Sequence, residues 1–206
     1  MEKGIHYIEN VFEYNDLLGV ETLHPLVSVI DLSKAHPMKH VRHIFGFYAI
    51  FLKEVKCGDL LYGRQHYDYQ EGTLVCLAPG QVIGIEDNGE VYQPKGWALV
   101  FHPDLIRGTS LGRNIREYSF FSYEVNEALH LSEREREMVI DCFLKIATAN
   151  GSSPSTSKCC STTVCASTNG SSSPVRASIT TFWPGSNGCS TTILQGNVPS
   201  AKGCLR

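Results

Sequence analysis

The acidic residues of this chain stop at Asp141, and this feature constrains its fold more than any other. All 21 Asp and Glu residues lie at or before that position. The 60 residues from Ala147 to Arg206 contain 22 Ser or Thr, four basic residues and no acidic residue. They also lack the apolar periodicity that is typical of helices and strands. The sequence therefore predicts a folded part at residues 1–146 and a disordered, low-complexity tail at residues 147–206.

The composition as a whole leaves room for one core and shows no strong charge bias. The chain has 206 residues, a net charge of −3 and 42% hydrophobic residues, which suits one domain with an appendage. A net charge this close to zero does not indicate a basic surface that would bind nucleic acid. No apolar run is long enough to span a bilayer. The N-terminus has no apolar signal-peptide region. We therefore expect a cytoplasmic protein that binds neither a membrane nor DNA directly.

The first part has the short strands and frequent turn signals of a mainly β fold. Its candidate strands are residues 43–55, 60–69, 73–77, 82–86, 91–93 and 96–102, separated by Gly, Pro and Asn turn signals. Short strands at this close spacing are typical of a β-barrel or a β-sandwich. Residues 114–121 fit either a strand or a short helix.

A helix is predicted after these strands. Ser132 and Glu135 have the spacing of a capping box, in which the Ser hydroxyl accepts an early backbone N–H and the Glu reaches back. The run that follows places four residues on one face at helical spacing: Val139, Cys142, Phe143 and Ile146. We expect this face to pack against the strands.

Four polar residues have the order of a metal-binding motif. His66, Asp68 and Glu71 follow a glycine, and His102 follows a later Pro-x-Gly stretch. This order resembles the two motifs of cupin barrels, in which three His and one Glu hold a metal ion; here Asp68 stands in place of one His. The resemblance implies a mixed nitrogen and oxygen site and a small cupin metalloenzyme as the alternative function. The simpler interpretation is that His66 and His102 are barrel-wall residues that make hydrogen bonds.

The stretch HVRH at residues 40–43 also invites a metal interpretation. Its two His, His40 and His43, are three positions apart, and such positions face opposite sides of a strand. One ion could not easily reach both. We interpret this stretch, together with Lys34, His36 and Lys39, as a solvent-exposed segment that leads into the strand (a solvated lead-in).

Four longer strings in the first part carry a family resemblance. They are SKAHPMKHVRHIFGFYAIFLKE, YDYQEGTLVCLAPGQVIGI, GWALVFHPDLIRGTSLG and EYSFFSYEVNEALHLSERE. They are similar to the N-terminal sensor domain of AraC-type (AraC/XylS) transcription regulators of the Bacteroidetes kind, over roughly residues 31–146. The resemblance implies a cupin-like barrel (a double-stranded β-helix or jelly roll) that binds a small effector or mediates dimerisation, followed by one or two α-helices. In that family a helical linker and two helix-turn-helix units that bind DNA come next.

The tail has another interpretation when its codons are read one nucleotide earlier. In that frame residues 160–175 are compatible with LLNYCVRFYERQFITR, an amphipathic, charged string that is similar to the linker helix of the same family. We therefore expect a frameshifted product, in which an authentic sensor domain precedes out-of-frame translation and the DNA-binding domain is missing. A genuine Ser/Thr-rich linker is the alternative. The four tail cations, Lys158, Arg176, Lys202 and Arg206, are scattered and form no recognition helix.

The resemblance directs the search for a site to the interior of the barrel. The candidate ligand-binding residues are Phe45, Phe47, Tyr48, Tyr62, His66 and Trp97. Alternation along the strands points about half of them outward.

We find no nucleotide-binding motif and no nucleophile–base pair, so we expect no enzyme activity, no catalytic residue and no cofactor. The expected partners are an unidentified small-molecule effector and a second copy or an intact relative, as a homodimer or heterodimer. A product without function that is degraded from its tail is a further hypothesis.

Overall fold

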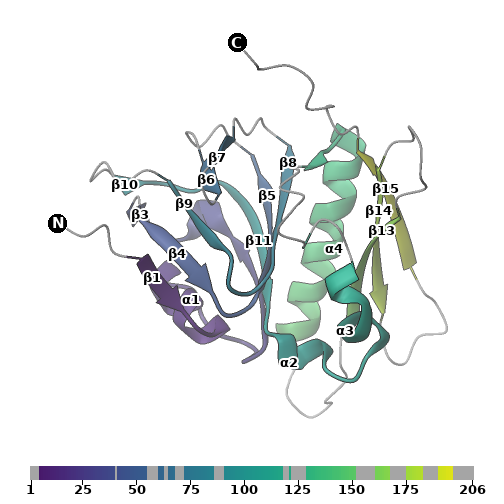
Figure 1. Cartoon of the computed structure of the whole chain (residues 1–206), viewed down its shortest axis with the longest axis horizontal. Helices are drawn as coiled ribbons and strands as arrows, with labels where there is room; N and C mark the ends of the chain where they lie inside the picture. Colours follow the sequence, from purple (N-terminus) through teal and green to yellow (C-terminus); the bar gives the residue numbers. More distant parts are fainter. Residues whose placement is uncertain are drawn as a thin grey trace.

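Two five-stranded sheets and a long helix form the frame of the protein (Figure 1). The computed structural model describes residues 5–39, 41–54, 60–62, 65–67, 72–85, 91–117, 121, 129–151, 161–167, 175–182 and 190–196. These residues form strands β1 to β15, helices α1 to α4 and two short 3-10 helices, η1 and η2. The prediction of a mainly β fold with following helices is confirmed.

The first sheet begins with a parallel pair and continues with antiparallel pairs. Its strands in hydrogen-bonded order are β1 (Ile5–Ile8), β4 (Arg42–Phe45), β9 (Val82–Ile85), β6 (Leu60–Tyr62) and β7 (Gln65–Tyr67). β1 runs parallel to β4, with Ile8 opposite Phe45, and the other pairs are antiparallel. A separate antiparallel ribbon pairs β3 (Met38–Lys39) with β10 (Val91–Tyr92).

The second sheet is antiparallel throughout. Its strands in order are β12 (Leu129–His130), β8 (Thr73–Leu77), β5 (Tyr48–Lys53), β11 (Gly96–Phe101) and β2 (Val27–Asp31). Among the described strands, no ladder joins this sheet to the first one. The described part is therefore a two-sheet sandwich, and closure into a cupin barrel stays a prediction.

Strand β5 lies at the centre of the second sheet, and all six of its residues are buried. Side chains alternate between the two faces of a strand. Ala49 and Phe51 belong to the apolar core between the two sheets, whereas Ile50 and Leu52 belong to a second core on the helix side of the sheet. A strand that is covered on both faces needs a continuous apolar run, which is why the sequence signal there is so strong.

The predicted strand at residues 43–55 is divided into β4 and β5 by Gly46 and Phe47. The chain passes there from the first sheet to the second. The Gly46 N–H donates to the carbonyl oxygen of Ile8 over 2.9 Å, and a Cβ at Gly46 would collide with the carbonyl oxygen of Glu9. Glycine allows this close approach between two backbones because it has no side chain.

The core between the sheets is closed at one side by α1 (Val11–Leu18). Asn10 caps this helix, because its side-chain oxygen accepts the Glu13 N–H over 2.9 Å. The helix ends at Gly19, whose φ of 67° is left-handed. Val11, Tyr14 and Leu18 point into the core.

The helix-side core packs against α4 (Glu133–Gly151), with α2 (Pro103–Ile106) and α3 (Ser110–Asn114) at its margin. The predicted apolar face of α4 is confirmed, since these four residues are all buried: Val139, Cys142, Phe143 and Ile146. The capping box is present in modified form. Glu135 accepts both the backbone N–H of Ser132, over 2.8 Å, and its hydroxyl, over 2.7 Å.

The ambiguous segment at residues 114–121 is helical where the structure describes it. Asn114 ends α3, and η2 (Ile115–Glu117) follows directly. The other 3-10 helix, η1 (Leu32–Lys34), follows β2. None of the described helices combines the length and the apolar character that crossing a bilayer requires.

Four stretches of the tail are described, and the expectation that residues 147–206 have no stable fold stays a prediction. Helix α4 continues past Ile146 to Gly151, and three antiparallel strands follow: β13 (Ser161–Ser167), β14 (Val175–Phe182) and β15 (Ser190–Gly196). These stretches are rich in Thr, Val and Ile, whose branched side chains favour extended backbone. Helix α4 lies between the second sheet and this tail sheet (Figure 1). The frameshift concerns the gene and stays a prediction.

Candidate functional site

A small cavity lies between the two sheets, beside the ribbon of β3 and β10. Its volume is about 50 Å³. Most of its wall is apolar, from residues on both sheets and the loops beside them: Leu32, Met38, Val41, Phe45, Phe51, Ile83 and Pro94. Lys39 also lines it and is exposed, so the cavity reaches the surface next to β3. A concave apolar site with a few polar groups is the usual form of a ligand-binding site.

Phe45 lies at the centre of the aromatic part of the cavity wall and contacts three other rings. Its ring stacks on that of Phe47 at 5.0 Å and meets Tyr14 edge-on at 5.4 Å. Phe51 adds a tilted contact at 6.3 Å from the second sheet. Such offset and edge-to-face pairs stabilise a fixed arrangement of rings beyond their burial alone. Phe45 therefore contacts aromatic rings from α1, from the crossing between the sheets and from the second sheet.

His43 is the polar residue that most distinguishes this cavity. Its side chain is 7% exposed, it lines the cavity, and its ring stacks on Phe45 at 6.1 Å with 7° between the planes. Neither ring nitrogen has a hydrogen-bond partner in the described part of the chain. Burial, with a smaller effect from nearby His6, lowers the His43 pKa to about 4. His43 is therefore neutral at neutral pH and offers one N–H donor and one acceptor nitrogen.

The interpretation of His43 as part of a solvated lead-in is wrong. His36 and Lys39 are exposed as expected, and His40 lies outside the described residues. His43, however, belongs to β4, where it shares a face with Phe45 two positions later. The sequence signal was the spacing of His43 and Phe45, because two residues at this spacing share one face of a strand.

Three further polar side chains line the cavity. Lys53, at the end of β5, is 8% exposed, and its ammonium lies 5.8 Å from the centroid of the Phe51 ring, a cation–π distance. Tyr14 is buried, and burial, helped by Tyr92, raises its pKa. The Tyr92 hydroxyl lies 3.9 Å from the sulfur of Met38. Among the described lining residues there is no Asp or Glu, so the charged groups there are cationic.

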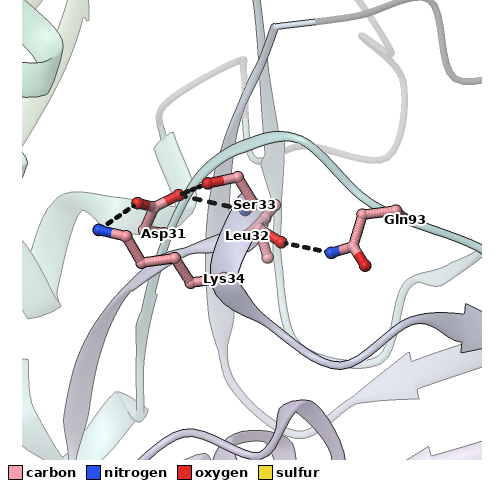
Figure 2. A network of polar contacts seen from close by, with 5 residues as sticks. All are labelled: Asp31, Leu32, Ser33, Lys34 and Gln93. Carbon is pink, nitrogen blue, oxygen red and sulfur yellow. Dashed lines mark hydrogen bonds and ion pairs between the residues drawn. The ribbon is translucent and has the colours of Figure 1, made fainter.

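A polar network holds η1, which supplies Leu32 to the wall (Figure 2). The Gln93 amide donates to the carbonyl oxygens of Leu32 and Ala35, each over 3.1 Å. The Asp31 carboxylate accepts the Ser33 N–H at 3.1 Å and pairs with Lys34 at 2.9 Å. Burial acts to raise the Asp31 pKa, but the bonds from Ser33 and the charge of Lys34 outweigh it and lower that pKa. Gln93 thus ties η1 to the chain beside β10.

The predicted ligand-binding residues divide between two faces of the second sheet. Phe45 lines the cavity, and Phe47 packs behind it. Tyr48 lies in the helix-side core, stacked on Phe101 at 5.2 Å. Trp97 is partly buried against the same core. Two predicted residues, Tyr62 and His66, lie on β6 and β7, and their side chains are outside the described part.

The predicted metal ligands are not brought together where the structure describes them. His102 caps α2, since its Nδ1 accepts the Asp104 N–H over 3.2 Å. His66 lies on β7, and β7 and α2 are at opposite ends of the sandwich (Figure 1). Asp68 and Glu71 lie outside the described residues. Within the described residues, no group of three or more His, Cys, Asp or Glu could hold a metal ion.

Comparison of the chain with protein-family models and with curated proteins finds no match. An assignment of function therefore rests on the chain's own residues and contacts.

Proposed function

We propose that this chain is the ligand-sensing and dimerisation domain of an AraC-type transcription regulator, and that the cavity between the sheets is its effector site. One observation carries the proposal: His43 is buried against the cavity with both ring nitrogens unpartnered among the described residues. An unsatisfied buried polar group costs about 1–3 kcal/mol. A bound ligand that accepts or donates a hydrogen bond there would recover that free energy.

The rest of the cavity supports a sensing role. Its aromatic wall gives apolar contact area, and its polar groups come from both sheets, His43 from the first and Lys53 from the second. A ligand between them would contact both layers of the sandwich. Binding would therefore stabilise the packing of the sheets, which is a physical route from effector to altered dimerisation.

This chain would act through a partner rather than by contacting an operator itself. Its tail cations are scattered, and its net charge is −3, so the electrostatic attraction to DNA is weak. We propose that it pairs with a second copy or with an intact relative and, in the second case, lowers the activity of that relative.

The alternative is a small cupin metalloenzyme that uses His66, Asp68, Glu71 and His102. Native mass spectrometry of the full chain, with metal analysis, separates the two functions. The sensing proposal expects a dimer without stoichiometric metal, together with a small molecule that raises the Tm. A monomer that retains one tightly bound transition metal would overturn it in favour of the enzyme.

A further inference from the structure

We infer that β1 forms a homodimer interface by pairing antiparallel with β1 of a second copy of this chain, with the two-fold axis at His6. This inference rests on the proposed sensing and dimerisation function and names the surface that dimerisation uses. Three properties of β1 lead to it: its unprotected edge, the direction of its free hydrogen-bonding groups and its position next to the cavity.

Strand β1 is an unprotected edge of the first sheet (Figure 1). A free edge is a template for pairing with another strand, and natural proteins protect such edges with Pro, Lys, a bulge or a covering helix. The sequence of β1 is IHYI, which contains neither Pro nor Lys. Ile5 is 42% exposed and Tyr7 is 70% exposed. Of the other edge strands of the two main sheets, β2 is packed by α1 and α4, whereas β7 and β12 are shorter than β1.

The backbone of β1 presents free hydrogen-bonding groups at this edge. The Ile8 carbonyl oxygen accepts the Gly46 N–H over 2.9 Å, so the backbone of Ile8 faces the side of β4. The side to which the backbone groups point alternates from residue to residue along a strand. Ile5 and Tyr7 therefore turn their N–H and C=O groups away from β4. In the described part of the chain these groups have no hydrogen-bond partner.

A two-fold axis at His6 satisfies all of these groups at once. It places Ile5 of one copy opposite Tyr7 of the other, and residues so placed exchange both N–H···O bonds in an antiparallel pair. The two side chains share one face of the strand, so the same register brings the exposed apolar side chains of both copies together. The free edge ends at Glu9, because the Glu9 N–H already donates to the Glu13 carboxylate over 2.8 Å.

This interface lies next to the cavity. His6 is opposite His43 in the ladder of β1 and β4, with 6.0 Å between the ring centroids, and His43 lines the cavity. A ligand bound at His43 therefore contacts β4, the strand that holds β1 in the sheet. A pairing of four residues a side is far smaller than the roughly 20–30 residues a side of a standard interface. We therefore expect a weak dimer, whose population a ligand can shift.

Analytical ultracentrifugation of the untagged full chain at a series of concentrations measures this dimer. Tyr7→Pro removes one edge N–H from each copy and should raise the dimer Kd about tenfold or more, because the two-fold axis doubles the loss. That N–H faces away from β4, so the pairing of β1 with β4 should remain. Tyr7→Val is the matched control: it also loses the ring but keeps the N–H and a residue that favours strands. It should weaken the dimer less than Tyr7→Pro does.

Disulfide cross-linking tests the register. In His6→Cys the two introduced thiols face each other at the axis, in a non-hydrogen-bonded pair with about 4.5 Å between the Cα atoms, which suits a disulfide. In Tyr7→Cys they are diagonal neighbours about 7–8 Å apart, so this variant should cross-link much less. The unaltered chain, which has eight Cys, gives the background under the same mild oxidation, and peptide mapping locates each cross-link.

The outcomes separate the interface from the function. Full dimerisation of Tyr7→Pro, or no cross-link through position 6 in a dimeric chain, would overturn the inference but leave dimerisation through another surface standing. A chain that is monomeric at every concentration would overturn both the inference and the homodimer of the proposed function. Effector binding, followed through the Tm, is measured independently of these results. If Tyr7→Pro fails to fold, the cross-linking of His6→Cys decides alone.

Discussion

His43 and Phe45 lie two positions apart on β4 with their rings stacked, 6.1 Å between centroids and 7° between planes. The stacking holds the imidazole flat against the aromatic wall of the cavity. It also keeps the ring away from bulk water, with 7% of the residue exposed. A titratable group in this position couples the protonation of the protein to its folding.

The first prediction concerns the pH dependence of stability. The His43 pKa is about 4 in the folded protein, against an ordinary value of 6.5. Between these pH values the unfolded chain binds the proton more readily, so lowering the pH favours unfolding. We expect this group to remove about 3 kcal/mol of stability as the pH falls from 6.5 to 4, with no further loss from it below that range. Urea unfolding at a series of pH values measures the slope.

The control for this slope is His43→Phe, which keeps an aromatic ring and removes the titration. The variant should have a shallower pH dependence over the same range. His24, whose pKa is also lowered by burial, should supply part of the slope that remains. Identical slopes in both proteins would show that His43 is not buried as described.

The second prediction compares neighbouring residues on α4. Phe143 is 1% exposed and Leu144 is 46% exposed. Phe143→Ala should lower the free energy of unfolding by about 3–5 kcal/mol, because it removes a buried ring and leaves a cavity. Leu144→Ala should change it by less than about 0.5 kcal/mol. Chemical denaturation measures both, and similar losses in the two variants would contradict the orientation of α4.

The third prediction tests the crossing between the sheets at Gly46. In Gly46→Ala the new Cβ would press on the carbonyl oxygen of Glu9, so β1 should separate from β4 and the amides of β1 should exchange faster with solvent. Gly80→Ala is the control, because its φ of +85° is unfavourable for Ala but nothing lies within 4 Å. We expect it to cost about 1–2 kcal/mol of global stability without selective exchange in β1. Hydrogen exchange followed by mass spectrometry distinguishes the two.

The fourth prediction concerns the gene rather than the fold. If the tail is out of frame, sequencing of the locus should reveal an open frame one nucleotide earlier that continues into a helical linker and two helix-turn-helix units. Restoring that frame should produce a longer protein that binds DNA. An uninterrupted frame on both sides of the Ile146 codon, with no coding potential in the alternative frame, would refute the hypothesis.

Local patterns in the sequence were sufficient to predict the elements whose buried residues recur at a regular spacing. The apolar face of α4 was predicted because Val139 and Phe143 recur at the helical period. The centre of β5 was predicted because burial on both faces demands an unbroken apolar run. The capping box was predicted in its spacing, although the Ser132 hydroxyl donates where an acceptor was expected.

The candidate site depended on contacts that no local pattern contains. The sequence placed Phe45 and Tyr48 together, but the crossing at Gly46 sends Phe45 to the cavity and Tyr48 to the helix-side core. Likewise His102 fitted a metal motif, and its position directly before α2 makes it a helix cap.

The sequence by itself determined which segments are extended, which face of α4 is apolar and where the acidic residues end, because these follow from residue types and their spacing. Only the tertiary structure decided that His43 is buried and that Lys53 and His43 line the same cavity from different sheets. It also decided that Tyr48 lies outside that cavity. The physical reason is that the burial of a strand residue depends on what covers its face. That cover comes from residues far away in the chain.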